Sequence, residues 1–194
     1  MQELRVGNPD QLATDVGPVI DAQARADIEA YIEQMRSQGH TVTRLELPAE
    51  CRHGHFVAPT LIEVSRVQDL SREVFGPVLH VLRYARKDMD ALLQDINSLG
   101  FGLTFGVHTR LDETVAHVSE RIHAGNIYVN RNIIGAVVGS QPFGGEGLSG
   151  TGFKAGGPNY LLRFVSERTL TVNTAAVGGN LALLGALRED HAPA

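Results

Sequence analysis

Helical and strand patterns alternate along this 194-residue chain, and their order limits the fold more than any single motif does. The clearest helix covers 89–99, where apolar residues recur at the 3.6-residue period, with Asp88 placed to cap it and Gly100 to end it. A strand pattern follows at 103–107. This alternation favours an α/β sandwich with a largely parallel sheet, in which ligands bind at loops beyond the strand ends.

Two more helices are predicted on the same grounds. Asp21 caps the first, whose apolar residues share one face and which ends at Gly39, and Asp112 opens the second. Pro59 cannot donate a hydrogen bond to a sheet, so we expect the β-rich stretch 55–64 at a sheet edge or a bulge. The remaining predicted strands are 41–47, 78–84, 126–130 and 160–173.

Charge and cysteine content argue against several classes of function. The formal net charge is -5 and the pI is about 5.9, so nucleic acid is not an expected partner, because phosphate backbones require a basic surface. The single cysteine, Cys51, cannot form an intrachain disulfide, which favours a reducing compartment, and we expect a cytoplasmic protein. No window has the length and apolar character of a membrane span or a signal peptide.

A glycine-rich run at 133–158 shows neither helical nor alternating periodicity, and compact domains usually keep such long irregular segments for function. Within it, 145–150 satisfies the G-x-G-x-x-G pattern of dinucleotide-binding turns. That fingerprint requires a strand directly before it and a helix at its end, whereas here a proline-bearing loop precedes it and more glycines follow. We therefore interpret 145–150 as a flexible or tightly turning loop.

Cys51, His53 and His55 lie close together and carry side chains that can bind zinc. No second ligand pair lies at a workable spacing, so we predict no functional metal site. As a nucleophile, Cys51 would need a lowered thiol pKa, usually from a helix N-terminus or a paired base. Since it lies in a loop that leads to a strand, we interpret it as an ordinary cysteine.

The segment Glu73-Val74-Phe75-Gly76-Pro77 joins a carboxylate, an aromatic ring and a tight turn just before a predicted strand. A carboxylate there can accept two hydrogen bonds from the vicinal hydroxyls of a ribose, and the ring two residues on lies on the same side. Taken alone, the segment is a weak signal, because a glutamate in a turn is most often solvated and a phenylalanine most often belongs to the core.

Several motifs follow one another in a fixed order. Glu73-x-Phe75-Gly-Pro precedes Gln-Pro-Phe-Gly-Gly at 141–145 and Ser-Gly-Thr-Gly at 149–152, and Asn-Ile-Tyr-Val-Asn occupies 126–130. The last resembles the G-x-[IV]-x-[IV]-N strand of the aldehyde dehydrogenase superfamily, and the ordered set as a whole resembles that superfamily over nearly the whole chain.

Three further segments narrow the resemblance. The stretches 130–139 and 154–161 are similar to those of L-glutamate γ-semialdehyde (1-pyrroline-5-carboxylate) dehydrogenases. Together with 173–180 they resemble the C-terminal part of bacterial bifunctional proline utilization proteins.

The resemblance implies roles for five residues. Glu73 would bind the nicotinamide ribose of NAD, with Phe75 packed beside it. Gly135 and Ala136 would form an anchor loop whose backbone N–H groups grip the α-carboxylate of the substrate, since successive amides in a turn make an anion-binding concavity. Phe143 would line the aliphatic chain of the aldehyde.

The resemblance also implies what the chain lacks. In the family a cysteine thiolate attacks the aldehyde and a hydride passes to NAD. The segment Gly7-Asn8-Pro9 resembles the family's stretch that follows the catalytic cysteine, so we expect this nucleophile and the NAD-binding domain upstream of it. No catalytic residue is therefore assigned within the chain, and the chain alone is expected to be inactive. FAD is expected only in a proline dehydrogenase domain further upstream.

The implied organisation is a partial catalytic domain at 1–160, with the family's three-layer α/β sandwich, an oligomerisation strand at 161–174 and a tail at 175–194. An exposed strand needs a covering partner, which favours a homodimer or a higher oligomer. The other expected partners are the aldehyde and the rest of the polypeptide. Two alternatives stay open: a non-catalytic module that keeps the fold for assembly or regulation, and a dehydrogenase for another aldehyde.

Overall fold

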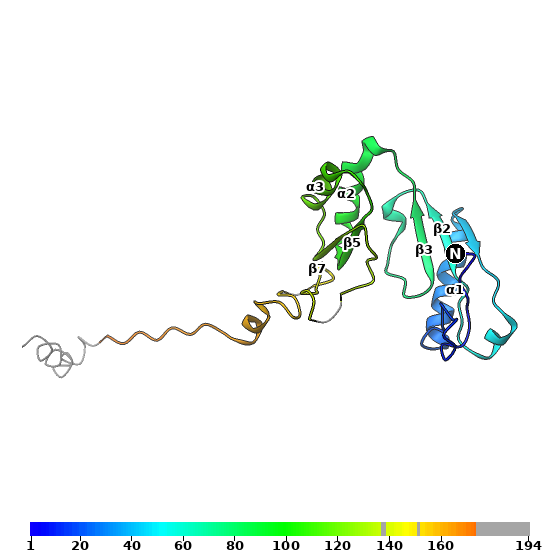
Figure 1. Ribbon diagram of the computed structural model, residues 1–194, viewed down its shortest axis with the longest axis horizontal. Helices are drawn as coiled ribbons and strands as arrows, with labels where there is room; N and C mark the ends of the chain where they lie inside the picture. Colours follow the sequence, from blue (N-terminus) through cyan, green and yellow to red (C-terminus); the bar gives the residue numbers. More distant parts are fainter. Residues whose placement is uncertain (137–138, 151, 174–194) are drawn as a thin grey trace, which may run out of the picture.

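The computed structural model describes residues 1–136, 139–150 and 152–173, and its elements fall into two groups (Figure 1). The first group consists of α1 (Ala22–Ser37), β1 (Thr41–Arg44), β2 (Thr60–Val64) and β3 (Val78–Leu82). The second consists of α2 (Met89–Ser98), β4 (Phe101–Gly102), β5 (Thr104–Val107), α3 (Asp112–Ser119), β6 (Asn126–Val129) and β7 (Glu146–Gly147). Short 3₁₀ helices cover Ala49–His53, Val67–Asp69, Arg86–Asp88 and Tyr160–Phe164. Within the described ranges, no helix combines the length and apolar character needed to cross a membrane.

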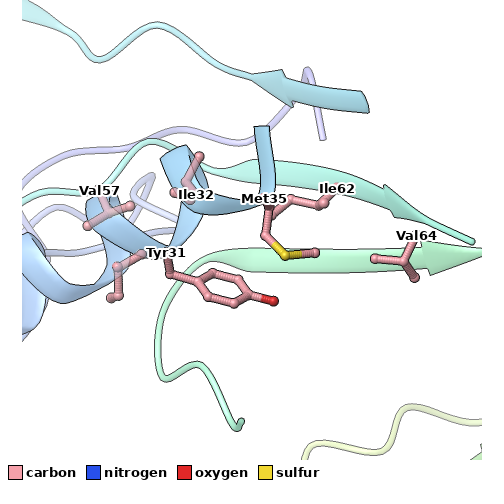
Figure 2. Close-up of a cluster of buried hydrophobic side chains, with 7 residues drawn as sticks. Tyr31, Ile32, Met35, Val57, Ile62 and Val64 are labelled. Atoms are coloured by element: carbon pink, nitrogen blue, oxygen red, sulfur yellow. The ribbon is translucent and has the colours of Figure 1, made fainter. Parts of the chain in front are cut away.

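The first group is a three-stranded sheet covered by α1. The strand order is β1-β2-β3, with β1 antiparallel and β3 parallel to β2. The Asp21 side chain accepts a hydrogen bond from the Ala24 amide at 2.7 Å, and Gly39 has a φ of 90°, so the predicted cap and stop of this helix are confirmed. The core between helix and sheet is formed by Ile28, Tyr31, Ile32, Met35, Val57, Ile62 and Val64 (Figure 2).

The strand β2 occupies the centre of this sheet, so the prediction that 55–64 lies at an edge or a bulge was wrong. Pro59 lies directly before the strand, which begins at Thr60, and the Pro59 carbonyl accepts a hydrogen bond from the Leu45 amide at 3.1 Å. The missing N–H of proline therefore interrupts no pairing inside the strand. Ile62, in the middle of β2, is fully buried as a result.

The second group places α2 and α3 against one face of the parallel pair β5–β6. Leu93, Val118 and Ile122 form its buried core, with apolar side chains of both strands packed against them. The opposite face includes Gly106, where a Cβ would collide with Ile133, so the loop after β6 covers that face. The α/β class is confirmed, and its parallel pairs, β2–β3 and β5–β6, are flanked by the antiparallel pairs β1–β2 and β4–β7.

The start of α2 differs from the prediction, whereas its end agrees with it. The helix begins directly after Asp88, but the Asp88 side chain makes no capping hydrogen bond. The 3₁₀ turn Arg86–Asp88 leads into the helix, so Asp88 has a φ of -98° and a ψ of 12° instead of the extended backbone of an N-cap. Gly100 follows the helix with a φ of 77°, as a left-handed stop requires.

The chain leaves the second group through the 3₁₀ helix Tyr160–Phe164 and continues to Asn173 as an extended, exposed arm (Figure 1). The predicted strand at 160–173 is therefore wrong for its first five residues. The described part of the arm beyond them pairs with no strand. A strand needs a neighbouring backbone to supply its hydrogen bonds, and no described residue does so here. The predicted tail at 175–194 lies outside the described residues.

Candidate substrate and cofactor site

The loop after β6 starts at Asn130, and both the backbone and the side chain of this residue set its direction. Among the described residues, Asn130 alone of the non-glycines has a positive φ, 55°. The Thr109 amide donates to Asn130 Oδ1 at 3.0 Å, and Asn130 Nδ2 donates to the Thr109 carbonyl at 2.9 Å. These two bonds tie the end of β6 to the segment after β5, which gives the loop a fixed starting point.

Two contacts to Tyr128 hold the two limbs of this loop, 131–135 and 141–144, against β6. The Gln141 side chain donates a hydrogen bond to the Tyr128 hydroxyl at 2.8 Å. On the other limb, the Arg131 guanidinium carbon lies 4.4 Å from the centre of the Tyr128 ring, a distance at which a cation is attracted by the ring face. Arg131 Nη2 also donates to the Gly135 carbonyl at 3.4 Å. Arg131 therefore connects the strand to the predicted anchor loop.

Gly135 and Ala136 are half-buried, and their amide N–H groups donate to no other described residue. A Cβ at Gly135 would meet no atom within 4 Å, so a ligand can approach the backbone there. Neighbouring free amides in a turn suit an anion. The geometry of this segment fits the carboxylate-binding role expected of Gly135 and Ala136.

Phe143 lies on the return limb of the same loop, and its backbone is held on both sides. Asn126 Nδ2 donates to the Pro142 carbonyl at 3.1 Å, and the Gly144 amide donates to Asn126 Oδ1 at 3.1 Å. Phe143 also exchanges both of its own backbone hydrogen bonds with Ala155, each at 3.1 Å. The ring of Phe143 is half-buried and is carried by a backbone that has little freedom to shift.

The glycines of 145–150 are required by close backbone approach. The segment forms β7, which pairs antiparallel with β4. A Cβ at Gly150 would collide with the Gly145 carbonyl oxygen, and Gly147 has a φ of 58°, which L side chains rarely adopt. No strand directly before this segment and no helix at its end provides a dinucleotide turn within the described ranges, so the interpretation as a tightly turning loop is confirmed.

Glu73 and Phe75 lie on the turn before β3, in the first group of elements. Glu73 is exposed and its carboxylate accepts no hydrogen bond from another described residue, and the Phe75 side chain is 79% exposed. The turn rests on α1 at Gly76, where a Cβ would lie 2.5 Å from Ile28 Cδ1. A cavity of about 210 Å³ beside this turn is lined by Ala24, Asp27, Ile28, Arg72, Glu73, Val74 and Phe75.

This arrangement suits the ribose end of a dinucleotide. A carboxylate without a partner can accept hydrogen bonds from two vicinal hydroxyls, and an exposed ring beside it offers an apolar surface. The residues present therefore fit the predicted cofactor contact.

Cys51 belongs to a small core rather than to a reactive site. It lies in the 3₁₀ helix Ala49–His53, is 4% exposed and packs with Val6 and Phe56. Its thiol donates to the Val6 carbonyl at 3.8 Å, and burial, followed by the nearby Glu50 carboxylate, raises the pKa of the thiol. A raised pKa opposes thiolate formation, so the interpretation of Cys51 as an ordinary cysteine is confirmed. The described residues include no group of side chains that could hold a metal ion.

The structure brings Gly135, Ala136 and Phe143 together on one loop over β6, whereas Glu73 and Phe75 lie on the other group of elements. No hydrogen bond, ion pair or ring contact among the described residues joins the two sets. Sequence reasoning missed the residues that hold the loop, and the signal that would have found two of them is the alternation of β6. Polar side chains at positions two apart share the buried face of that strand: Asn126 and Tyr128.

The chain matches the aldehyde dehydrogenase family over residues 1–170 and belongs to that family. It is 58% identical over 173 residues to the bifunctional protein PutA of Klebsiella aerogenes, covering 87% of this chain and 13% of that protein. It is 37% identical over 172 residues to a 1-pyrroline-5-carboxylate dehydrogenase of Anoxybacillus flavithermus, covering 88% of this chain and 33% of that protein.

Solved structures give the same result. A proline utilization A variant from Bradyrhizobium japonicum superimposes with a TM-score of 0.79 at 50% identity, covering 90% of this chain and 18% of that one. A Thermus thermophilus 1-pyrroline-5-carboxylate dehydrogenase variant does so with a TM-score of 0.72 at 37% identity, covering 84% and 31%. The chain therefore has the fold of part of an aldehyde dehydrogenase domain, and it spans about an eighth to a third of the length of the curated relatives it matches.

Proposed function

We propose that these residues form part of an NAD-dependent aldehyde dehydrogenase that oxidises L-glutamate γ-semialdehyde to L-glutamate in proline catabolism. The observation that carries the proposal is the pair of half-buried residues Gly135 and Ala136, whose amides donate to no other described residue, on a loop that also holds Phe143. An anion-binding turn beside an aromatic ring suits a short aliphatic aldehyde with a carboxylate at its far end. The similarity to 1-pyrroline-5-carboxylate dehydrogenases supports the same substrate.

In this proposal the chain's residues bind and orient, and the reactive thiol comes from elsewhere in the protein. Gly135 and Ala136 donate backbone hydrogen bonds to the substrate carboxylate, and Phe143 packs against its methylene groups. Glu73 accepts hydrogen bonds from the ribose of NAD, and Phe75 packs beside it. NAD supplies the hydride acceptor, and water supplies the second oxygen of the carboxylic acid. Cys51 takes no part, because it is buried away from this loop.

We further propose a cytoplasmic homodimer or higher oligomer in which the oligomerisation segment 161–174 contacts a second copy. Its exposed apolar side chains suit burial against a partner: Leu161, Leu162 and Phe164 on the 3₁₀ helix, and Val165, Leu170 and Val172 on the extended arm. The region 1–160 then belongs to the catalytic domain. Any FAD is bound outside these residues, in a proline dehydrogenase region.

The test of the substrate is steady-state kinetics on the full-length protein with Ala136→Leu. The larger side chain narrows the space over the anchor loop, so we expect kcat/KM to fall about tenfold or more for L-glutamate γ-semialdehyde and to stay within twofold for propanal. Equal losses for the two aldehydes would contradict the proposed substrate.

One observation keeps the second candidate function, a non-catalytic assembly module, in view: the chain's single thiol is buried and has a raised pKa. A cysteine in a Gly-Gln-x-Cys-like setting upstream in the reading frame supports the enzyme, and a frame that starts at Met1 supports the module. Turnover of the semialdehyde with NAD by the 194-residue chain alone would show that the nucleophile does not have to come from outside it.

A further inference from the structure

The face of β6 that points away from α2 and α3 carries two polar side chains to which the proposed function gives no contact with substrate or cofactor. Asn126 is 8% exposed and Tyr128 is 5% exposed, and as residues two apart they share one face of the strand. Burying an amide and a phenol is costly unless both are hydrogen-bonded. Among the described residues, the hydrogen-bond partners of these two side chains all lie in one short segment, 141–144.

Asn126 fixes the backbone on each side of Phe143. Its Nδ2 donates to the carbonyl of Pro142, and its Oδ1 accepts from the amide of Gly144. One end of the amide must donate and the other must accept, so this arrangement works in one orientation only. With its own backbone groups bonded to Ala155, Phe143 has its place set by four hydrogen bonds around one residue.

Tyr128 contacts both limbs of the loop at once. Its hydroxyl accepts from Gln141 on the limb that leads to Phe143, and its ring lies under Arg131 on the limb that leads to Gly135. Arg131 extends this contact to the Gly135 carbonyl. A single buried side chain therefore links the anchor loop to the residue predicted to line the aliphatic chain.

We propose that Asn126 and Tyr128 are positioning residues that set the separation between the amides of Gly135–Ala136 and the ring of Phe143. This separation makes the enzyme selective for an aldehyde whose carboxylate lies a fixed number of carbons from the reacting carbonyl. The proposal rests on the proposed function. A substrate held at both ends makes both contacts only at that separation, so a shifted loop weakens its binding and raises KM. A simple aldehyde has no carboxylate and does not sense the separation.

The experiment compares Tyr128→Phe, Gln141→Leu, their double variant and Asn126→Asp in the full-length protein. Tyr84→Phe is the matched control, because it also removes one phenol hydroxyl but from a half-exposed side chain outside the loop. For each protein, kcat and KM are measured with L-glutamate γ-semialdehyde and with propanal, at saturating NAD. The melting temperature is recorded alongside.

We expect Tyr128→Phe and Gln141→Leu each to raise KM for the semialdehyde about fivefold, the effect of one lost hydrogen bond, with kcat within twofold. The double variant should be no worse than either single variant, because both remove the same bond. Asn126→Asp should raise this KM about tenfold or more, because a carboxylate oxygen then faces the Pro142 carbonyl. All four variants, and the control, should keep propanal kinetics near those of the wild type. The melting temperature should stay near the wild-type value in the control and fall modestly in the four variants, because each of them loses a hydrogen bond of a buried side chain or of its partner.

Three results would overturn the proposal. An unchanged KM for the semialdehyde in Tyr128→Phe and Gln141→Leu shows that the loop is not set by β6, and an equal loss for both aldehydes shows general damage. Additive losses in the double variant show that the two side chains act separately. If Asn126→Asp does not fold, the other variants carry the test. A wild-type protein that oxidises propanal but not the semialdehyde removes the proposed substrate as well, and is distinguishable from these results.

Discussion

The two segments proposed to bind ligands are built in opposite ways. The turn that carries Glu73 and Phe75 leaves both side chains exposed and touches α1 at Gly76, whereas the loop over β6 is bound by hydrogen bonds on both limbs. The difference follows from which atoms do the binding. A long carboxylate side chain can reach a ribose through its own rotamers, but an anchor made of backbone amides is useful only if the backbone itself is fixed.

The largest expected effect comes from adding one methyl group to a glycine that lies in, or in contact with, each segment. A Cβ at Gly125, just before β6, would collide with the carbonyl oxygen of Gly144, and backbone cannot rotate away. At Gly76 the Cβ would meet the tip of Ile28, which can change rotamer. We expect Gly125→Ala to lower the free energy of unfolding by about 3 kcal/mol and Gly76→Ala by under about 1 kcal/mol.

Urea unfolding of the full-length protein measures both glycine variants. Gly17→Ala is the control, since its Cβ would make only an ordinary contact of 3.7 Å with Pro9. If Gly125→Ala and Gly76→Ala lower the free energy of unfolding by similar amounts, the loop over β6 is no more rigid than the turn at Gly76, and the comparison fails.

Glu73→Gln tests the exposed segment without disturbing its fold. The amide keeps the shape of the side chain but loses the charge that strengthens hydrogen bonds to the ribose, so we expect KM for NAD to rise about tenfold. KM for the aldehyde and the melting temperature should not change, because Glu73 is exposed and contacts no described residue through its carboxylate. A higher KM for the aldehyde would show that Glu73 affects substrate binding, which would contradict its predicted contact with NAD.

The support beneath this turn should depend on pH. Tyr31 on α1 is hydrogen-bonded to Nε2 of His80 on β3 at 2.8 Å, and burial, followed by the charge of His40, lowers the pKa of His80. The Arg72 guanidinium carbon lies over the Tyr31 ring, 5.4 Å from the ring centre. A lowered pKa means that the folded state favours neutral His80. The stability that the fold gains from keeping His80 neutral is therefore complete above the unfolded-state pKa and is lost as the pH falls through the folded-state pKa.

Thermal unfolding at pH 7.5 and 5.5 measures this effect. The wild type should lose stability on acidification, and His80→Gln should lose less, because the titrating group is gone. Tyr31→Phe at pH 7.5 should cost about 1 kcal/mol, the contribution of one hydrogen bond. An equal acid response in the wild type and in His80→Gln would show that His80 does not titrate in this range.

Arg131→Lys should give the smallest change. Lysine keeps the charge near the Tyr128 ring but does not present the planar donor group that reaches the Gly135 carbonyl. We expect KM for the semialdehyde to rise about twofold to threefold, since a cation over a ring at an exposed site contributes about 0.5–1 kcal/mol and most of it is retained. Kinetics with both aldehydes measure it, and a tenfold rise would make Arg131 a direct ligand instead.

Local signals in the sequence predicted the helices better than the sheets. The Asp21 cap and the stops at Gly39 and Gly100 depend on a few neighbouring residues, and all three are present. The place of 55–64 in the sheet depends on which strands lie on each side of it, which no residue within the stretch specifies. The same limit applies to 160–173, where a strand needs a backbone that the described chain does not supply.

The candidate site divides along the same line. Glu73, Phe75, Gly135, Ala136 and Phe143 were named from sequence because the motifs that contain them are contiguous. The residues that position the loop could not be named, because Asn126 and Tyr128 acquire their partners only when the chain reverses and returns 15 or so residues later along β6. Both residues belong to the strand motif at 126–130, but their contacts form only when the chain folds.

The exposed arm has a consequence for how such a polypeptide behaves in solution. Its exposed apolar side chains lie on an extended segment, 165–172, that pairs with no strand among the described residues, so an open strand edge of another chain can bind it. Assembly therefore competes with aggregation in time, and the outcome depends on concentration. If the oligomer proposed above forms, rapid pairing with a second copy protects the protein, and we expect light scattering to rise with concentration once the arm is left uncovered.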